Sequence, residues 1–250
     1  MAASLGVPAV HHGFGRMVPV DAFERAAEST APLWRVRGLE PPPLNCAFEG
    51  VYVDICPPSF QTNRPPVGTQ VELLRPVSAQ PTAKTAPPTV YVTLGTAFND
   101  LALFRVLLDA LADLECAVIA TIGSDNDPAA LGKIPANAAI ERYVPQEEIL
   151  PRCSATVGHG GSGSTLAALA YGLPMLLVPQ GADQFENAQA CGELGVARVL
   201  MPGEMTADAV RNTVADLLAD SAYSERAALI ASEIADMPPP EAVASTLKSS

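Results

Sequence analysis

The sequence lacks any apolar run approaching ~20 residues, the length that a membrane-spanning helix requires. Its N-terminus has no charged region followed by a long apolar core, so neither a membrane span nor a signal peptide is indicated. Positive charge is scarce, with 15 Lys and Arg against 27 Asp and Glu and a formal net charge of −12. This balance argues against nucleic acid or anionic lipid as a partner, and we expect a cytoplasmic protein.

Cysteine and histidine are also scarce. The five cysteines are odd in number, widely spaced and without a CxxC pair, which favours reduced thiols over a disulfide framework or a zinc site. His11, His12 and His159 are the only histidines, too few for a histidine-based metal centre. We therefore expect no metal, and we assign no role to His11 or His12.

Hydrophobic residues make up 48% of the 250 residues, enough for one large domain or two small ones. From residue 90 onward, short apolar runs alternate with segments of helical periodicity. This alternation predicts an α/β fold with a doubly wound, Rossmann-like parallel sheet, in which ligands bind at the carboxyl ends of strands. The expected strands are 90–94, 117–122, 138–143, 154–157, 175–178 and 197–200, and the expected helices are 101–114, 147–150, 164–171, 184–194, 206–219 and 221–235.

Proline clusters punctuate the first part of the chain and predict its organisation. We expect the C-terminal part of an incomplete domain over 1–76, a polar, proline-rich linker over 77–88, a ligand-binding domain over 89–236, and a helical segment over 237–250 that returns toward the first part. Upstream of the linker, only one or two strand–helix units fit, with a strand at 6–11 and a helix at 20–36. An unfinished sheet edge there would favour self-association, for example as a homodimer.

The most informative motif is the run V-G-H-G-G-S-G-S-T at 157–165, a glycine-rich turn between a short apolar strand and a helix. Free N–H groups and the positive end of a helix dipole would face an anion there, and glycine lets the backbone approach it closely. His159 can donate a hydrogen bond to a phosphate oxygen, and Ser164 and Thr165 can contact phosphate or cap the helix. The alternatives are a flexible turn and a histidine that only caps the strand.

Named motifs of other enzyme classes are absent from this turn. No Gly-Lys-Ser/Thr follows it, so it is not a Walker loop, and it is not a GxGxxG turn at the first strand. A lipase-like oxyanion loop would need a GxSxG nucleophile elbow, which this sequence lacks because Ser164 stands where the closing glycine should be.

Three further segments lie at the same predicted sheet edge. The pair Asp183-Gln184 suits the adjacent hydroxyls of a sugar, although an N-cap for the following helix would by itself be the stronger interpretation. The segment 143–146 offers Tyr143 and free backbone groups to a nucleobase, although a tyrosine in the core is the commoner outcome. The small-residue turn Gly95-Thr96 converges on the same cleft.

Taken together, these motifs resemble the donor-binding half of family-one glycosyltransferases, most closely the bacterial enzymes that decorate macrolides, enediynes and other natural products. The resemblance is specific over residues 89–200, and the segments 52–61 and 74–76 resemble the region that joins the two domains of that family. It rests on R-Y-V-P-Q at 142–146, H-G-G-S-G-S-T at 159–165, G-L-P at 172–174 and P-Q-G-A-D-Q-F-E-N-A at 179–188.

The resemblance implies a two-domain GT-B fold and an inverting, metal-independent transfer of a sugar from a nucleoside diphosphate to a small natural-product acceptor. Plant relatives carry a ribose-binding glutamate at the position of Ala167, so the resemblance favours a dTDP-linked deoxysugar over a UDP-sugar. The implied contacts are Tyr143 and Val144 for the base, Thr96, His159, Gly161, Ser162, Gly163 and Ser164 for the diphosphate, and Asp183 and Gln184 for the sugar.

The resemblance also implies that the catalytic histidine of the family and its aspartate partner belong to the first half of the N-terminal domain, before this sequence begins. We therefore assign no catalytic residue, and we expect this chain alone to bind donor yet transfer sugar poorly. The alternative hypothesis is a non-catalytic subunit that binds nucleotide-sugar, or a partner subunit, whose fold another chain completes.

Overall fold

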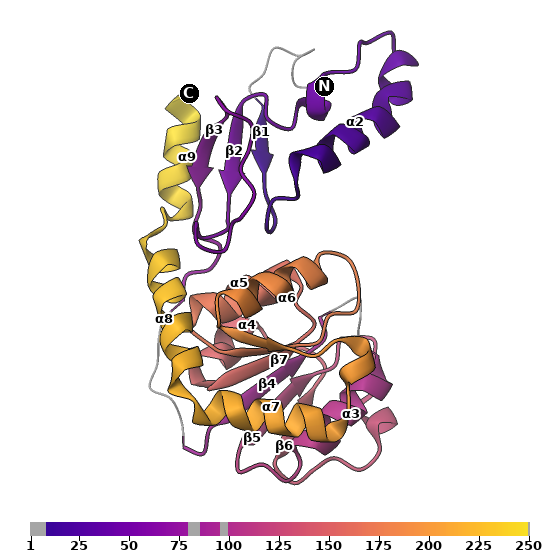
Figure 1. Cartoon of the computed structure of the whole chain (residues 1–250), viewed down its shortest axis with the longest axis vertical. Coiled ribbons are helices and arrows are strands. Elements are labelled where there is room, and N and C mark those ends of the chain that lie inside the picture. Colours follow the sequence, from indigo (N-terminus) through magenta and orange to yellow (C-terminus); the bar gives the residue numbers. More distant parts are fainter. Residues whose placement is uncertain (1–8, 80–85, 96–99, 250) are drawn as a thin grey trace. The chain divides into compact units, whose positions relative to one another are not determined.

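The structure is a computed structural model that describes residues 9–79, 86–95 and 100–249. The chain divides into two compact units, one formed by Met1–Pro76 with Asp236–Ser250 and the other by Val77–Ala235. Each unit is built on a parallel sheet (Figure 1). Within the described ranges, no helix is both long enough and apolar enough to cross a membrane.

The second unit contains a six-stranded sheet in the order β6-β5-β4-β7-β8-β9, with every neighbouring pair parallel. The first three strands along the chain extend from the centre in one direction and the next three in the other, which confirms the doubly wound α/β fold. The strands are β4 (Thr89–Thr93), β5 (Ala117–Thr121), β6 (Ala138–Glu141), β7 (Ala155–Gly158), β8 (Met175–Leu177) and β9 (Ala197–Val199).

Helices cover both faces of this sheet (Figure 1). On one face, α3 (Leu101–Leu111) and α7 (Ala207–Ala219) pack Phe104, Leu107, Val210 and Val214, all fully buried, against the central strands. The central strands are themselves buried along their whole length, as expected for a parallel sheet covered on both sides. The other face carries α4 (Gln146–Ile149), α5 (Ser162–Ala170) and α6 (Gln184–Glu193), and α8 (Ser221–Asp236) ends the unit.

The expected elements of this unit are present, with one shift that matters for the site. The helix after the glycine-rich turn begins at Ser162, two residues earlier than expected. Ser162 and Gly163 are therefore in the first helical turn, where their N–H groups have no intrahelical partner. Short 3-10 helices lie at Pro128–Leu131, Leu150–Arg152 and Pro202–Glu204.

The first unit contains a three-stranded parallel sheet in the order β1-β2-β3. The strand expected at 6–11 lies partly outside the described residues and overlaps β1 only at its end, the helix expected at 20–36 is α2, and β2 and β3 were not predicted. Val243 of the last helix packs on Val51 and Val53 of β2, and Arg75 donates from Nε to the Met237 carbonyl at 3.1 Å. The elements are β1 (Val10–His12), α2 (Val20–Arg35), β2 (Val51–Asp54), β3 (Gln70–Leu73) and α9 (Pro240–Ser249), with a 3-10 helix at Pro43–Cys46.

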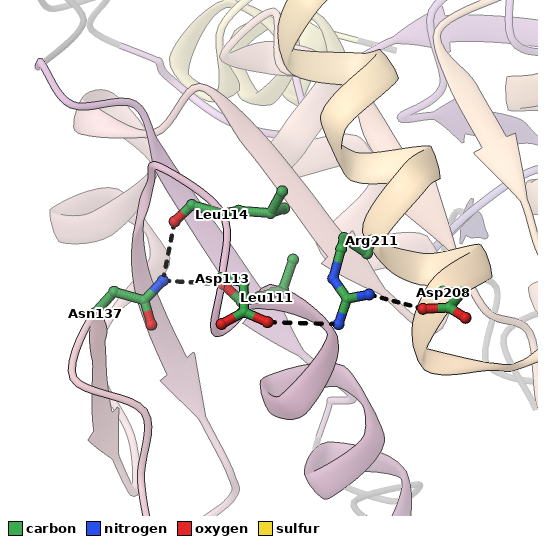
Figure 2. A network of polar contacts seen from close by, with 6 residues as sticks. All are labelled: Leu111, Asp113, Leu114, Asn137, Asp208 and Arg211. Carbon is green, nitrogen blue, oxygen red and sulfur yellow. Dashed lines mark hydrogen bonds and ion pairs between the residues drawn. The ribbon is translucent and has the colours of Figure 1, made fainter.

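A polar network closes the end of α3 in the second unit (Figure 2). The side-chain amide of Asn137 donates to the carbonyls of Leu111 and Cys116 at 3.0 Å each. Nearby, the Arg211 guanidinium of α7 binds Asp208 at 2.7 Å and lies 3.9 Å from Asp113. Asn137 thus ties the end of α3 to Cys116, the residue before β5, and it adds a second donor to the Leu111 carbonyl, which also accepts from the Leu114 N–H at 3.2 Å.

We predict that Asn137→Ala lowers the free energy of unfolding by about 1–3 kcal/mol, because it removes two part-buried hydrogen bonds that tie the end of α3 to Cys116. Urea unfolding followed by circular dichroism measures this change. Asn212→Ala is the matched control, since Asn212 is an exposed residue of α7 and its replacement should change stability by less than about 0.5 kcal/mol. Equal effects of the two substitutions would contradict the role given to Asn137.

Candidate functional site

The candidate site lies where the strand order of the six-stranded sheet reverses. Strands β4 and β7 pair in parallel there, with Thr93 opposite Gly158. His159 directly follows Gly158, and Gly95 comes two residues after Thr93, so the two turns leave the carboxyl edge of the sheet beside each other. In open α/β sheets, this position is the usual place for a bound ligand.

Two glycines enclose the imidazole of His159. A Cβ atom on Gly161 would lie 2.5 Å from His159 Nε2, and a Cβ atom on Gly95 would lie 2.7 Å from His159 Cε1. Gly95 also has a φ of +76°, which favours glycine independently of the space available. Gly95 and Gly161 therefore leave room for the histidine ring.

The N-terminus of α5 leaves several backbone N–H groups without a partner in the helix. Gly161 is the N-cap residue, and having no side chain it leaves the first-turn N–H groups of Ser162, Gly163 and Ser164 uncovered. The Ser164 hydroxyl donates to the Gly161 carbonyl at 3.1 Å, which leaves its oxygen as an acceptor. Thr165 is only 1% exposed and therefore belongs to the core.

His159 is the titratable group at this helix terminus. Burial lowers its pKa below the ordinary 6.5, while the charge of Asp183 and the carbonyl of Thr93 oppose part of that shift. Its Nδ1 atom is buried and makes no hydrogen bond of good geometry with a described residue, although the Thr93 carbonyl is near enough to favour the protonated ring. A buried polar atom in this condition is suited to a ligand that supplies the partner. A phosphate oxygen would do so, and it would also favour the protonated imidazole.

A cavity of about 320 Å³ adjoins this group at the carboxyl ends of β4 and β5. Its volume is at the lower end of the ~300–1,000 Å³ range of small-molecule sites. On one side it includes Thr93 and Gly95, next to the imidazole, and on another it includes Tyr143 and Val144. Tyr143 is 71% exposed, so it is not the core tyrosine that its residue type would more often indicate. The remaining lining residues are Tyr91, Thr121, Gly123, Ser124, Arg142, Gln146 and Glu147.

Asp183 and Gln184 lie at the start of α6, and each has a role other than capping. Asp183 occupies the N-cap position without capping the helix through its side chain. Its Oδ2 instead accepts from the Ser162 hydroxyl at 2.6 Å. Gln184 is 2% exposed, and its Oε1 accepts from the N–H groups of Gln180 and Gly181 at 2.8 and 3.1 Å. Of its side-chain polar groups, the amide nitrogen is the one left for a ligand.

Sequence reasoning missed Asn187, which connects the glycine-rich turn with α6. Asn187 is 1% exposed and donates to the Gly160 carbonyl at 2.9 Å and to Asp183 Oδ2 at 3.0 Å. Its place four residues after Asp183 on one helix face was the only available indication. Thr96, the remaining predicted diphosphate ligand, lies outside the described residues. Within those residues, no group of histidine, cysteine, aspartate and glutamate side chains could hold a metal ion.

Comparisons with known proteins bear on this arrangement. Over 256 aligned residues, the chain is 32% identical to the elloramycin glycosyltransferase ElmGT of Streptomyces olivaceus. That alignment covers 99% of this chain and 64% of the relative, so the chain spans slightly less than two thirds of that protein's length.

Solved structures are similar over nearly the whole chain. CalG4, the calicheamicin glycosyltransferase, has a TM-score of 0.82 and 26% identity, over 99% of this chain and 68% of that one. The spinosyn rhamnosyltransferase SpnG complexed with thymidine diphosphate has a TM-score of 0.81 and 27% identity, over 99% and 69%. These likenesses identify the parallel-sheet architecture as that of GT-B glycosyltransferases.

The family model described as "Erythromycin biosynthesis protein CIII-like, C-terminal domain" matches residues 105–249, more than half of the chain. The matched region contains the glycine-rich turn and the start of α6, the two segments that meet at the candidate site. The chain therefore belongs to the erythromycin biosynthesis protein CIII-like family of antibiotic glycosyltransferases.

Proposed function

We propose that the protein takes part in transferring a sugar, with inversion, from a nucleoside diphosphate, most favourably dTDP, to a natural-product acceptor. The observation that carries the proposal is the arrangement at the strand reversal. There the uncovered N-terminus of α5 and the unpartnered Nδ1 of His159 adjoin a cavity of about 320 Å³. The similarity to the elloramycin glycosyltransferase, and to a rhamnosyltransferase structure that contains thymidine diphosphate, supports the proposed sugar transfer from a dTDP donor.

The diphosphate would bind at the N-terminus of α5. The N–H groups of Ser162, Gly163 and Ser164 would donate to its oxygens, the absent side chain of Gly161 would allow the approach, and His159 would donate from the buried imidazole. Thr96 remains a prediction for the same group. Local donors matter here because the formal net charge of −12 gives the protein no general attraction for an anion.

The base and the sugar would extend in different directions from the diphosphate. The base would enter the cavity, with Tyr143 against its face and the backbone of Val144 at its edge. The sugar would lie toward the start of α6, where Asp183 can accept from a hydroxyl and the amide nitrogen of Gln184 can donate to one. Ala167, 5% exposed in α5, offers no polar group to a ribose 2′-hydroxyl, which favours a dTDP donor over a UDP donor.

In the proposed reaction, an acceptor hydroxyl attacks the anomeric carbon, and a new carbon–oxygen bond forms on the face opposite the leaving group. The bond to the β-phosphate oxygen breaks, and its electron pair passes to the departing diphosphate. The helix N-terminus and His159 would stabilise the charge that develops there, which is where preorganised donors contribute most to rate. The acceptor's proton passes to a base that we do not assign.

We predict that the full chain binds dTDP more tightly than UDP or GDP, and that His159→Ala weakens dTDP binding about ten- to hundredfold. The expected loss corresponds to one hydrogen bond to a charged group, about 1.5–3 kcal/mol. Isothermal titration calorimetry measures the affinities. His12→Ala, which changes an exposed histidine of the other unit, is the control. If none of the three nucleotides binds, the donor-site assignment is wrong.

Binding should also depend on pH. Because burial holds the pKa of His159 low, the free protein has a neutral imidazole at neutral pH, whereas a bound diphosphate favours the protonated form. Binding therefore raises the pKa, and affinity should increase as the pH falls from about 8 to about 5.5.

dTDP-glucose is the probe for this dependence, because its diester diphosphate does not titrate in that range. Calorimetry in buffers of different ionisation enthalpy should show proton uptake on binding by the wild type and by His12→Ala, and none by His159→Ala. A pH dependence that persists in His159→Ala would assign the titration to another group.

Gly95→Ala tests whether donor binding depends on the position of the His159 ring, because this substitution removes no ligand contact. Gly95→Ala should weaken dTDP binding at least about fivefold, because the new Cβ would overlap His159 Cε1 and displace the ring. Gly68→Ala is the matched control, since Gly68 also has a positive φ, +95°, but no atom lies within 4 Å of a Cβ there. Equal affinity in wild type and Gly95→Ala would show that the ring position is not critical.

A further inference from the structure

The carboxylate of Asp183 is held by two donors from the segments that form the site. The Ser162 hydroxyl donates to Asp183 Oδ2 at 2.6 Å, and the Asn187 side-chain amide donates to the same oxygen at 3.0 Å. Ser162 belongs to the first turn of α5, whereas Asp183 and Asn187 flank the first turn of α6. Oδ1 is left as the carboxylate oxygen that can accept from a ligand.

Asn187 fixes this arrangement to the backbone of the glycine-rich turn. Besides Asp183, its amide nitrogen reaches the Gly160 carbonyl at 2.9 Å and the Ser162 hydroxyl oxygen at 3.2 Å. Gly160 has a φ of +86°, and a Cβ atom there would lie 3.1 Å from the Gln184 carbonyl, so the two segments approach each other closely. Because Asn187 is 1% exposed, its hydrogen bonds form largely without competition from water.

The hydroxyl and the backbone N–H of Ser162 are available to different partners. A serine hydroxyl carries a single proton, and the hydroxyl of Ser162 gives that proton to Asp183. Its backbone N–H, by contrast, is one of the uncovered groups at the N-terminus of α5. The backbone of Ser162 is therefore available to a diphosphate, while its side chain is engaged by the carboxylate.

Helix capping does not account for these contacts. The Asp183 side chain makes no capping hydrogen bond to α6, and the start of that helix is instead held by Gln184, whose Oε1 accepts from Gln180 and Gly181. An exposed serine–carboxylate hydrogen bond alone would contribute little to stability. Ser162 and the buried Asn187 both donate to Oδ2 of Asp183, a residue that is otherwise exposed. These two hydrogen bonds are better explained as a means of orienting Oδ1.

We propose that Ser162 and Asn187 are positioning residues that orient Asp183 toward a hydroxyl of the donor sugar, and that the Ser162 side chain is not a diphosphate ligand. The proposal rests on the proposed function of this site. Ser162 thus acts on the sugar through Asp183 and on the diphosphate through its backbone. Removing its hydroxyl should affect recognition of the sugar and leave recognition of the nucleoside diphosphate unchanged.

The test compares dTDP with dTDP-glucose, titrated calorimetrically into the full chain and its variants. Ser162→Ala should bind dTDP within about twofold of wild type and dTDP-glucose about five- to twentyfold more weakly, which is less than the full loss of a hydrogen bond to a charged group because Asp183 remains but is no longer held by Ser162. Ser162→Thr, which keeps a hydroxyl, should restore most of the affinity for dTDP-glucose. Ser221→Ala is the matched control, because Ser221 also donates to a carboxylate, Glu225, at the start of a helix.

A double-mutant cycle separates positioning from direct contact. In an Asp183→Ala background, Ser162→Ala should cause no further loss of dTDP-glucose affinity, because the group that Ser162 orients is gone. Asn187→Ala should weaken dTDP-glucose binding more than dTDP binding, because it releases Asp183 and also the Gly160 carbonyl of the glycine-rich turn. Its thermal melting curve identifies any general unfolding, which would weaken both ligands equally.

The possible outcomes separate a failure of the positioning role from a failure of the proposed donor-binding function. If Ser162→Ala weakens dTDP as much as dTDP-glucose, its hydroxyl binds the diphosphate and the inference is wrong. If neither affinity changes, the hydrogen bond to Asp183 has no role in donor recognition, and the inference is again wrong. If the wild type binds neither ligand, the proposed function itself fails.

Discussion

The parallel pairing of β4 with β7 is the constraint on which the candidate site depends. Because Thr93 lies opposite Gly158, the turns after the two strands leave the sheet at adjacent positions, and His159 fits between Gly95 and Gly161. Both strands are buried along their length, so a slip in register would displace buried residues from the core. The stability of the sheet centre therefore also fixes the position of the imidazole.

The same constraint sets the electrostatics of the site. Placing His159 at the sheet edge beneath two turns removes much of its hydration, which lowers its pKa and favours the neutral ring in the free protein. With a formal net charge of −12, the protein as a whole repels an anionic ligand. Attraction must then come from groups within a few ångströms, and the uncovered N–H groups of α5 supply it without adding a cation.

Features that depend on local pattern could be predicted from the sequence. The six strands of the second unit and the turn around His159 follow from short apolar runs and glycine spacing, which act over a few residues. Strands β2 and β3 were missed because each has four residues in a proline-rich stretch, and β3 contains the polar residues Gln70 and Glu72. Local periodicity carries little information at that length.

The contacts between the glycine-rich turn and the start of α6 could not be predicted, because they join residues more than twenty positions apart. Nothing near Asn187 in the sequence shows that it will meet the Gly160 carbonyl, and nothing near Asp183 shows that Ser162 will hold it. The residue types of Asp183 and Gln184 suggested a sugar pair, but only the structure shows the Gln184 oxygen engaged by its own loop. Residue type indicates what chemistry is possible, and the fold decides which atoms are available for it.

Fixing Asp183 through Ser162 and Asn187 has a consequence for the proposed reaction. In an inverting displacement, negative charge grows on the departing diphosphate while the sugar changes shape at its anomeric carbon. Protein groups that are already oriented do not have to move as this charge develops. Such preorganised groups lower the activation barrier of the transfer most. A carboxylate held by two donors and a row of backbone N–H groups at a helix N-terminus both meet that condition. The hydroxyl of Ser162 holds the Asp183 carboxylate, and the N–H of Ser162 belongs to the row at the N-terminus of α5. The first turn of one helix would therefore fix the position of the sugar relative to that of the leaving group.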